Sequence, residues 1–194
     1  MRAEKLLHAL IGAVFAISLH AAYADTYSYT FDVLVHGTNA SPPPWGKVSF
    51  TDVSGGVQMD LNLSFLGPLT RDDAPYDVFL FFNISSSLAG LTFLNNGGDV
   101  AGGITVSGNS LQMDGDGKFD VRFQWATQPD GSRSTFNQSS NYLISGTGLS
   151  AASFNSTSVS AHGGYFAGQQ MGNINDGGNT VTVVAIPEPE TYAM

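Results

Sequence analysis

Cysteine is absent from this chain of 194 residues, which excludes disulfides, thiolate zinc sites and a cysteine nucleophile. Positive charge is scarce, because only 7 lysines and arginines stand against 16 aspartates and glutamates, and the formal net charge is −9. Nucleic-acid binding needs clustered Lys and Arg to neutralise phosphates, so this balance argues against a nucleic-acid partner. Charged residues make up only 12% of the chain, so its solubility depends on Ser, Thr, Asn, Gln and Gly.

Helical periodicity is also absent outside the N-terminal segment, and alternation takes its place. Apolar and polar residues alternate over residues 57–65 and 118–125, which is the period of a half-buried strand. The stretch Val78–Phe82 is apolar throughout, so we expect a central strand covered on both faces. Further strands are predicted at residues 27–35, 46–52, 76–85, 91–94, 104–107, 142–145, 159–161 and 180–186. This pattern predicts a single all-β domain over residues 25–186, an antiparallel β-sandwich or jelly-roll-like fold.

Residues 1–24 have the pattern of a secretory signal peptide. A positively charged start is followed by an apolar run over residues 6–19. Small residues at Ala22 and Ala24 form a cleavage site, so we expect a signal-peptide helix, export through the Sec machinery and cleavage by signal peptidase before Asp25. The apolar run is shorter than the roughly 20 residues that a membrane-spanning helix needs.

A proline-rich motif follows the last predicted strand. The sequence Pro187-Glu188-Pro189 breaks any strand or helix, because each proline fixes φ and lacks a backbone donor. We therefore expect an exposed, extended segment directly after residues 180–186.

The segment Ile-Pro-Glu-Pro-Glu-Thr-Tyr-Ala-Met at residues 186–194 resembles the opening of the PEP-CTERM sorting signal of exported Gram-negative proteins. In that family the Pro-Glu-Pro motif precedes a transmembrane helix and a short basic cluster. An inner-membrane exosortase recognises and processes the whole signal. Residues 187–194 match only the start of this pattern, so we expect a truncated sorting signal there.

The resemblance extends into the domain itself. An Asp-Gly-Asp-Gly turn at residues 114–117, a Gly-Thr-Gly-Leu stretch at 146–149 and a glycine-rich segment with aromatics at 162–167 occur in this order. Many small PEP-CTERM ectodomains are similar. The resemblance implies an exported protein of the cell surface or of an extracellular polysaccharide matrix such as a biofilm, with exosortase as a partner and no assigned enzymatic activity.

Catalytic residue sets are sparse in the domain. After residue 24 the chain has two histidines, His36 and His162, and no Gly-x-Ser-x-Gly nucleophile elbow. Its only glutamates there, Glu188 and Glu190, lie beyond the last predicted strand, away from any carboxylate pair of the glycosidase kind. We therefore expect no enzyme and assign no catalytic residue.

The segment around Asp114, Asp116 and Asp120 permits two interpretations. Asp-Gly dipeptides favour the tight turn of a β-hairpin, with a strand beginning at once after it. The three carboxylates are also the ligand type that a calcium ion prefers, although the remaining spaced ligands of an EF-hand are missing. A hairpin alone and a hairpin that binds calcium weakly both remain open.

Aromatic residues leave a second functional hypothesis open. Trp125 lies on the apolar phase of its strand, which predicts burial, whereas Trp45 follows three prolines and is the better candidate for an exposed ring. An exposed ring would stack on sugars, and packing in the core is the alternative. The leading hypothesis is thus a non-enzymatic exported surface or matrix protein, and the alternative is a secreted carbohydrate- or surface-binding module, with calcium as a candidate cofactor.

Five Asn-x-Ser/Thr sequons occur, at Asn39, Asn62, Asn83, Asn137 and Asn155. They would be surface acceptors if a glycosylation system reached them. The alternative is that a composition rich in Asn, Ser and Thr produces them by chance.

Overall fold

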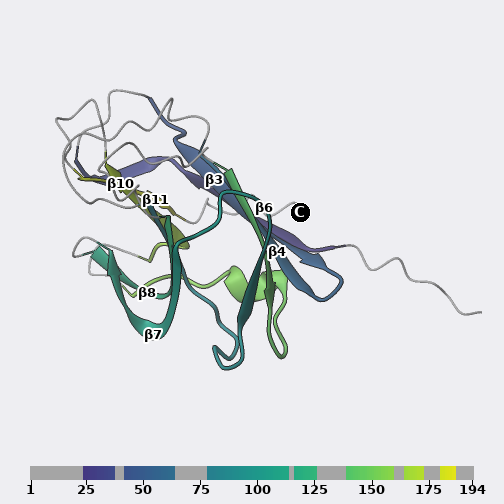
Figure 1. Cartoon of the computed structure of the whole chain (residues 1–194). Helices are drawn as coiled ribbons and strands as arrows, with labels where there is room; N and C mark the ends of the chain where they lie inside the picture. The colour runs from purple at the N-terminus through teal and green to yellow at the C-terminus, as the bar shows by residue number, and fades with distance from the viewer. Residues whose placement is uncertain are drawn as a thin grey trace, which may run out of the picture.

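The strands of this protein form two antiparallel sheets that face each other (Figure 1). The computed structural model describes residues 24–37, 42–63, 78–113, 116–125, 139–159, 164–172 and 180–186. The elements are β1 (Thr26–Phe31), β2 (Val33–His36), β3 (Gly46–Val53), β4 (Gly56–Asn62), β5 (Val78–Phe82), β6 (Thr92–Gly98), β7 (Gly103–Met113), β8 (Asp116–Trp125), β9 (Ser139–Ser145), the 3-10 helix η2 (Ala151–Phe154), β10 (Ala167–Gly172) and β11 (Thr180–Ala185). The predicted antiparallel β-sandwich is confirmed.

The chain passes from one sheet to the other at both sides of the sandwich. Sheet A has the order β1-β3-β4-β9-β6, and sheet B has the order β2-β11-β10-β5-β8-β7. The consecutive strands β1 and β2 are edges of different sheets, and so are β6 and β7. These two crossings join the edges of the two sheets through short stretches of backbone.

The main core lies between the two sheets. Alternate residues of the facing strands are buried there, among them Phe50 and Met59 of sheet A and Leu80 and Phe123 of sheet B. Phe154 of η2 stacks on Phe50 with ring centroids 4.0 Å apart. The short helix thus adds its aromatic ring to the core against strand β3.

A second, smaller apolar cluster covers the other face of sheet B. It contains Phe81, Met113, Phe119, Tyr165 and Val184. A Cβ atom added at Gly168 on β10 would meet the side chain of Met113, so this glycine allows the end of the β7–β8 hairpin to lie against the sheet. Strand β5 therefore has buried residues on both faces, and the prediction of a central strand covered on two sides is confirmed.

Two strand predictions need correction, and one strand was missed. The predicted strand at residues 27–35 is two strands, because the backbone breaks at Asp32 as the chain moves from sheet A to sheet B. The predicted strand at 159–161 is represented, within the described residues, by an isolated bridge between Val159 and Lys118. Strand β10 was not predicted, because its sequence Ala-Gly-Gln-Gln-Met-Gly lacks an alternating pattern.

The expected signal peptide and sorting signal lie largely outside the described residues. Of the predicted cleavage site, Ala24 and Asp25 are described and lie immediately before β1, whereas Ala22 is not. Pro187, Glu188 and Pro189 are likewise outside the described ranges. Within those ranges, no helix combines the length and hydrophobicity that crossing a membrane requires.

Candidate functional site

Trp45 is buried, which corrects the expectation of an exposed ring. Its side chain is 5% exposed and belongs to the main core. The backbone N–H of Trp45 donates to the carbonyl of Phe31 at 2.8 Å, so the residues after the prolines already run beside β1. A ring with no exposed face cannot stack on a sugar. Trp125 is also buried, at 2% exposed, and in its case burial was predicted from its place in the alternation.

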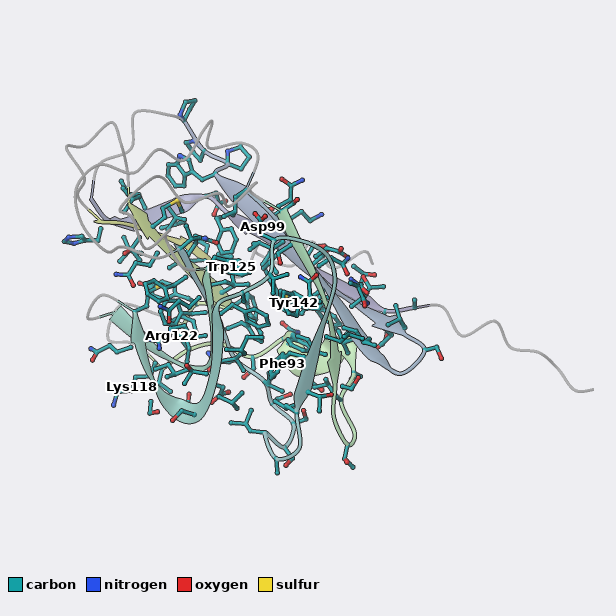
Figure 2. All side chains as sticks on the ribbon, in the orientation of Figure 1. Phe93, Asp99, Lys118, Arg122, Trp125 and Tyr142 are labelled. Atoms are coloured by element: carbon teal, nitrogen blue, oxygen red, sulfur yellow. The ribbon has the colours of Figure 1, made fainter. Side chains whose placement is uncertain are left out.

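The aromatic rings near Trp125 form a packed group between the sheets (Figure 2). The ring of Phe123 on β8 lies 4.9 Å from that of Tyr142 on β9 and 5.5 Å from that of Phe93 on β6, both edge-on. Trp125 stacks against Phe123 at 5.7 Å. These rings join sheet A to sheet B, and their contacts are those of a core rather than of a stacking platform.

Asp99, between β6 and β7, accepts three side-chain hydrogen bonds at its backbone carbonyl. The donors are Trp125 Nε1 at 3.2 Å, Ser140 Oγ at 2.6 Å and Asn95 Nδ2 at 3.1 Å. Figure 2 shows Asp99 beside Trp125, near the ends of the facing strands. These bonds satisfy the polar atoms of the buried side chains and fix the crossing between the sheets.

Asp120 was predicted as a candidate calcium ligand and is a buried carboxylate. Its Oδ2 accepts the backbone N–H of Ile84 at 3.0 Å, and its Oδ1 accepts that of Asn109 at 2.7 Å. Both oxygens thus hold backbone amides of other segments, one just beyond β5 and one within β7. This arrangement gives Asp120 a role in joining two segments of the chain.

The other two predicted calcium ligands are Asp114 and Asp116. Asp114 and the side chain of Asp116 lie outside the described residues. Among the residues that are described, no group of three or more His, Cys, Asp or Glu side chains is close enough to hold a metal ion. The hairpin itself is confirmed, because Met113 pairs with Asp116 across β7 and β8. Calcium binding stays a prediction.

Sequon positions differ in their exposure. Asn83 is buried at 1% exposed, so an enzyme cannot reach it in the folded protein, and the expectation of a surface acceptor is wrong there. Asn62 and Asn155 are exposed, whereas Asn39 and Asn137 lie outside the described residues.

The two histidines of the domain differ in what the structure describes. His36 ends β2, as expected of a strand-end histidine, and His162 lies outside the described residues.

The outer face of sheet A is the best candidate for a binding surface. We call it the polar face and define it by the outward positions of β1, β3, β4 and β9, paired across the strands: Thr26, Ser28, Thr30, Lys47, Ser49, Thr51, Gln58, Asp60, Asn62, Ser139, Asn141 and Leu143. Nine of these twelve side chains are polar and uncharged, one is apolar, and the two charged ones, Lys47 and Asp60, have opposite signs. The face therefore offers hydroxyl and amide groups with little net charge.

Hydrogen bonds between neighbouring strands organise the polar face. The hydroxyls of Thr26 and Thr51 are 3.0 Å apart, and Asn141 donates to the carboxylate of Asp60. Opposite side chains on paired strands have Cβ atoms about 5 Å apart, so these groups form rows of donors and acceptors. Such rows can bind a polyhydroxylated ligand, and they supply no nucleophile paired with a general base.

The sequence contained part of the signal for this face. Alternation over residues 46–52 and 57–65 separates Ser, Thr, Asn and Gln from the apolar residues, so a wet strand face was visible for each segment. The pairing of β4 with β9, a strand about 80 residues later in the chain, was not visible.

Comparisons with protein-family models, with curated protein sequences and with solved structures find no match for this chain.

Proposed function

We propose that this chain is a non-enzymatic exported protein of the cell surface or extracellular matrix, sorted by an exosortase-type system and associated with exopolysaccharide. The observation that carries the proposal is a pair of address motifs in one sequence. One is the apolar run with its cleavage pattern at Ala22 and Ala24, and the other is Pro187-Glu188-Pro189 directly after the segment that forms β11.

The domain between the motifs has properties that suit an extracellular location. It contains no cysteine, so an oxidising environment cannot create wrong disulfides. The paired hydroxyl and amide side chains of the polar face support the association with a neutral polysaccharide. Ordered side chains such as Thr26 and Thr51 reduce the entropy that is lost when a ligand binds.

Cell fractionation tests the export and the sorting. In a Gram-negative host with an active exosortase, we expect the protein in the envelope or medium with Asp25 as its first residue, as determined by mass spectrometry. Ala24→Lys should accumulate as the uncleaved precursor. Retention of the wild type in the cytoplasm with Met1 intact would contradict export.

Sorting is tested separately, with and without the host exosortase. Replacement of Glu188 by Lys should change the distribution of the protein only when the exosortase is present, and Glu190→Lys is the control outside the tripeptide. If neither exosortase deletion nor Glu188→Lys changes the distribution, the chain is a released protein, and the alternative of a secreted binding module is favoured.

Retention on the host exopolysaccharide tests the polar face. Gln58→Arg places a bulky cation at the centre of that face, and Gln112→Arg, on the exposed side of β7 in sheet B, is the matched control. We expect retention to fall several-fold for the first variant only. The same measurement with a chelator tests the calcium-dependent alternative, and equal retention of both variants would remove the polar face from the proposal.

A further inference from the structure

We infer that two copies of this chain pair through strand β6, antiparallel to each other about a two-fold axis at Leu94, so that their A sheets become one continuous sheet. This inference is independent of the proposed export. It begins from the position of β6 at the edge of sheet A, where β9 is its sheet neighbour on one side. Its other edge carries no strand among the described residues.

The free edge of β6 has few of the features that usually prevent pairing. Edge strands are normally protected by charged side chains, prolines or bulges. The sequence Thr-Phe-Leu-Asn-Asn-Gly-Gly of β6 has no charge and no proline, and its register is regular from Thr92 to Asn95 before a bulge. Leu94 is 61% exposed near the middle of that regular part. An exposed leucine on an open edge gains apolar burial when a second strand adds to it.

The charge of the molecule favours a second copy at this edge. Two copies of a protein with net charge −9 repel each other over most of their surface. From Leu91 to Met113, which includes β6 and β7, Asp99 is the one charged residue. Three of the seven exposed large hydrophobic side chains in the described residues, Leu94, Val100 and Val106, belong to the same stretch. This side is therefore where two copies approach with the least repulsion.

Symmetry restricts the possible registers, and the exposure of Leu94 selects among them. A two-fold axis perpendicular to the sheet keeps each side chain on its own face, so paired residues must share a face. Placing Leu94 opposite the Leu94 of a second copy satisfies this condition. It also brings Phe93 opposite Asn95 within the regular part of the strand, and no like charges meet.

The other edges are less suitable for such pairing. The outward side chains of β1 are Thr26, Ser28 and Thr30, so pairing there would bury little apolar surface. Strand β2 has only four residues. The ladder of β7 shifts register twice, between Val106 and Leu111 and between Gln112 and Met113, whereas that of β6 shifts once, after Asn95. These differences assign the contact to β6.

Sedimentation velocity of the purified protein measures the association. We expect a dimer whose dissociation constant is unchanged or smaller at higher salt, because screening weakens the repulsion between acidic copies. Leu94→Lys should raise the dissociation constant about tenfold or more, while Val159→Lys, at a site 64% exposed, should not. A monomer at all concentrations up to about 100 μM, or a dimer that Leu94→Lys leaves intact, overturns the inference.

Cross-linking tests the register without depending on a destabilising variant. The chain has no cysteine, so Leu94→Cys introduces a single thiol. Opposite residues of antiparallel strands have Cα atoms about 4.5–5.5 Å apart, within the range of about 4.4–6.8 Å that a disulfide spans. Mild oxidation should link the Leu94→Cys variant into dimers quickly and leave Val159→Cys largely monomeric. Equal rates of linkage for both variants, with circular dichroism showing both folded, would refute the β6 contact.

Discussion

Single buried polar groups in this sandwich hold loop backbone against the sheets. The carboxylate of Asp120 accepts one amide from the residue that follows Asn83 and another from the bulged part of β7. The carbonyl of Asp99 accepts three side-chain donors at the crossing from β6 to β7. In both places the hydrogen bonds give partners to polar atoms. Without a partner, each such atom would cost about 1–3 kcal/mol when removed from water.

Replacing Asp120 by Ala should destabilise the protein by about 3 kcal/mol, because the N–H groups of Ile84 and Asn109 lose a charged acceptor. Urea unfolding followed by circular dichroism measures the loss. Asp60→Ala is the control, since that exposed carboxylate accepts from Asn141 at the surface and its removal should cost less than about 1 kcal/mol. Equal losses in the two variants would show that Asp120 does not act through its buried amides.

Tyr29 gives the molecule a predictable response to alkali. Burial raises the pKa of Tyr29, with a smaller contribution from Tyr27, and its hydroxyl donates to the carbonyl of Phe154 at 3.2 Å. Because the pKa is higher in the folded state, the contribution to stability is complete below the unfolded value of about 10 and is lost as pH rises above it. We expect the free energy of unfolding to fall above about pH 10 in the wild type.

The variant Tyr29→Phe should lose much of this alkaline decline, at a cost of about 1 kcal/mol at neutral pH for the missing hydrogen bond. Tyr27→Phe, whose ring is only partly buried, should alter the decline less. Chemical unfolding at a series of pH values gives both results. A decline of the same slope in wild type and Tyr29→Phe would assign the alkaline response to other groups.

Residue-level prediction from the sequence succeeded where the alternating pattern applied and failed outside it. Trp125 lies within a strand of strict alternation, so its burial was predictable. Trp45 stands before its strand, and its burial follows from the contact with Phe31, which only the pairing of β1 with β3 creates. The burial of Asp120 has a similar origin, because its carboxylate accepts from Ile84, 36 residues earlier in the chain.

A strand could be predicted when its own sequence showed a clear apolar or alternating pattern. The uniform apolar character of β5 indicated that both of its faces are covered, and the sheet order places it between β10 and β8. Strand β10 had no such signal, because Gly168 accommodates the side chain of Met113 and Gln169 is buried at a position where alternation would place an apolar residue. The division between β1 and β2 depends on which sheet each joins, and a local pattern contains no such information.

The turn between β3 and β4 allows a test at the scale of one element. Gly56 has φ of 155°, and an added Cβ would collide with the backbone carbonyl of Ile144 on β9. Gly55 has φ of 91°, but an added Cβ there would meet no atom within 4 Å. We expect Gly56→Ala to cost about 2–4 kcal/mol and Gly55→Ala about 1 kcal/mol, since only the first adds a clash to the backbone strain.

Thermal melting and urea unfolding of the two glycine variants provide the comparison. The size of the difference reports how closely β4 and β9 approach at this end of sheet A. If Gly55→Ala proved the more harmful of the two, backbone conformation rather than contact with β9 would control the turn.

At the scale of the whole molecule, a chain with few charges and no cysteine depends on apolar burial for its stability. The sandwich is closed by chain crossings at both sides, and its stability comes from apolar burial between the sheets and over the outer face of sheet B. Fold class could be predicted from the sequence because alternation and turn residues recur along the chain. The polar face could be predicted only strand by strand, since alternation alone does not align the strands that assemble it.

The positions of the few cationic side chains have a consequence for proteolysis. Among the described residues the cations are Lys47 on β3 and Lys118 and Arg122 on β8, the last lying over the ring of Phe79 at 5.3 Å. Proteases that cut after Lys or Arg need extended backbone that is free of a sheet, and each of these residues belongs to a paired strand. Cleavage at these three bonds must therefore wait for the strands to open, so its rate reports on local unfolding of the sandwich.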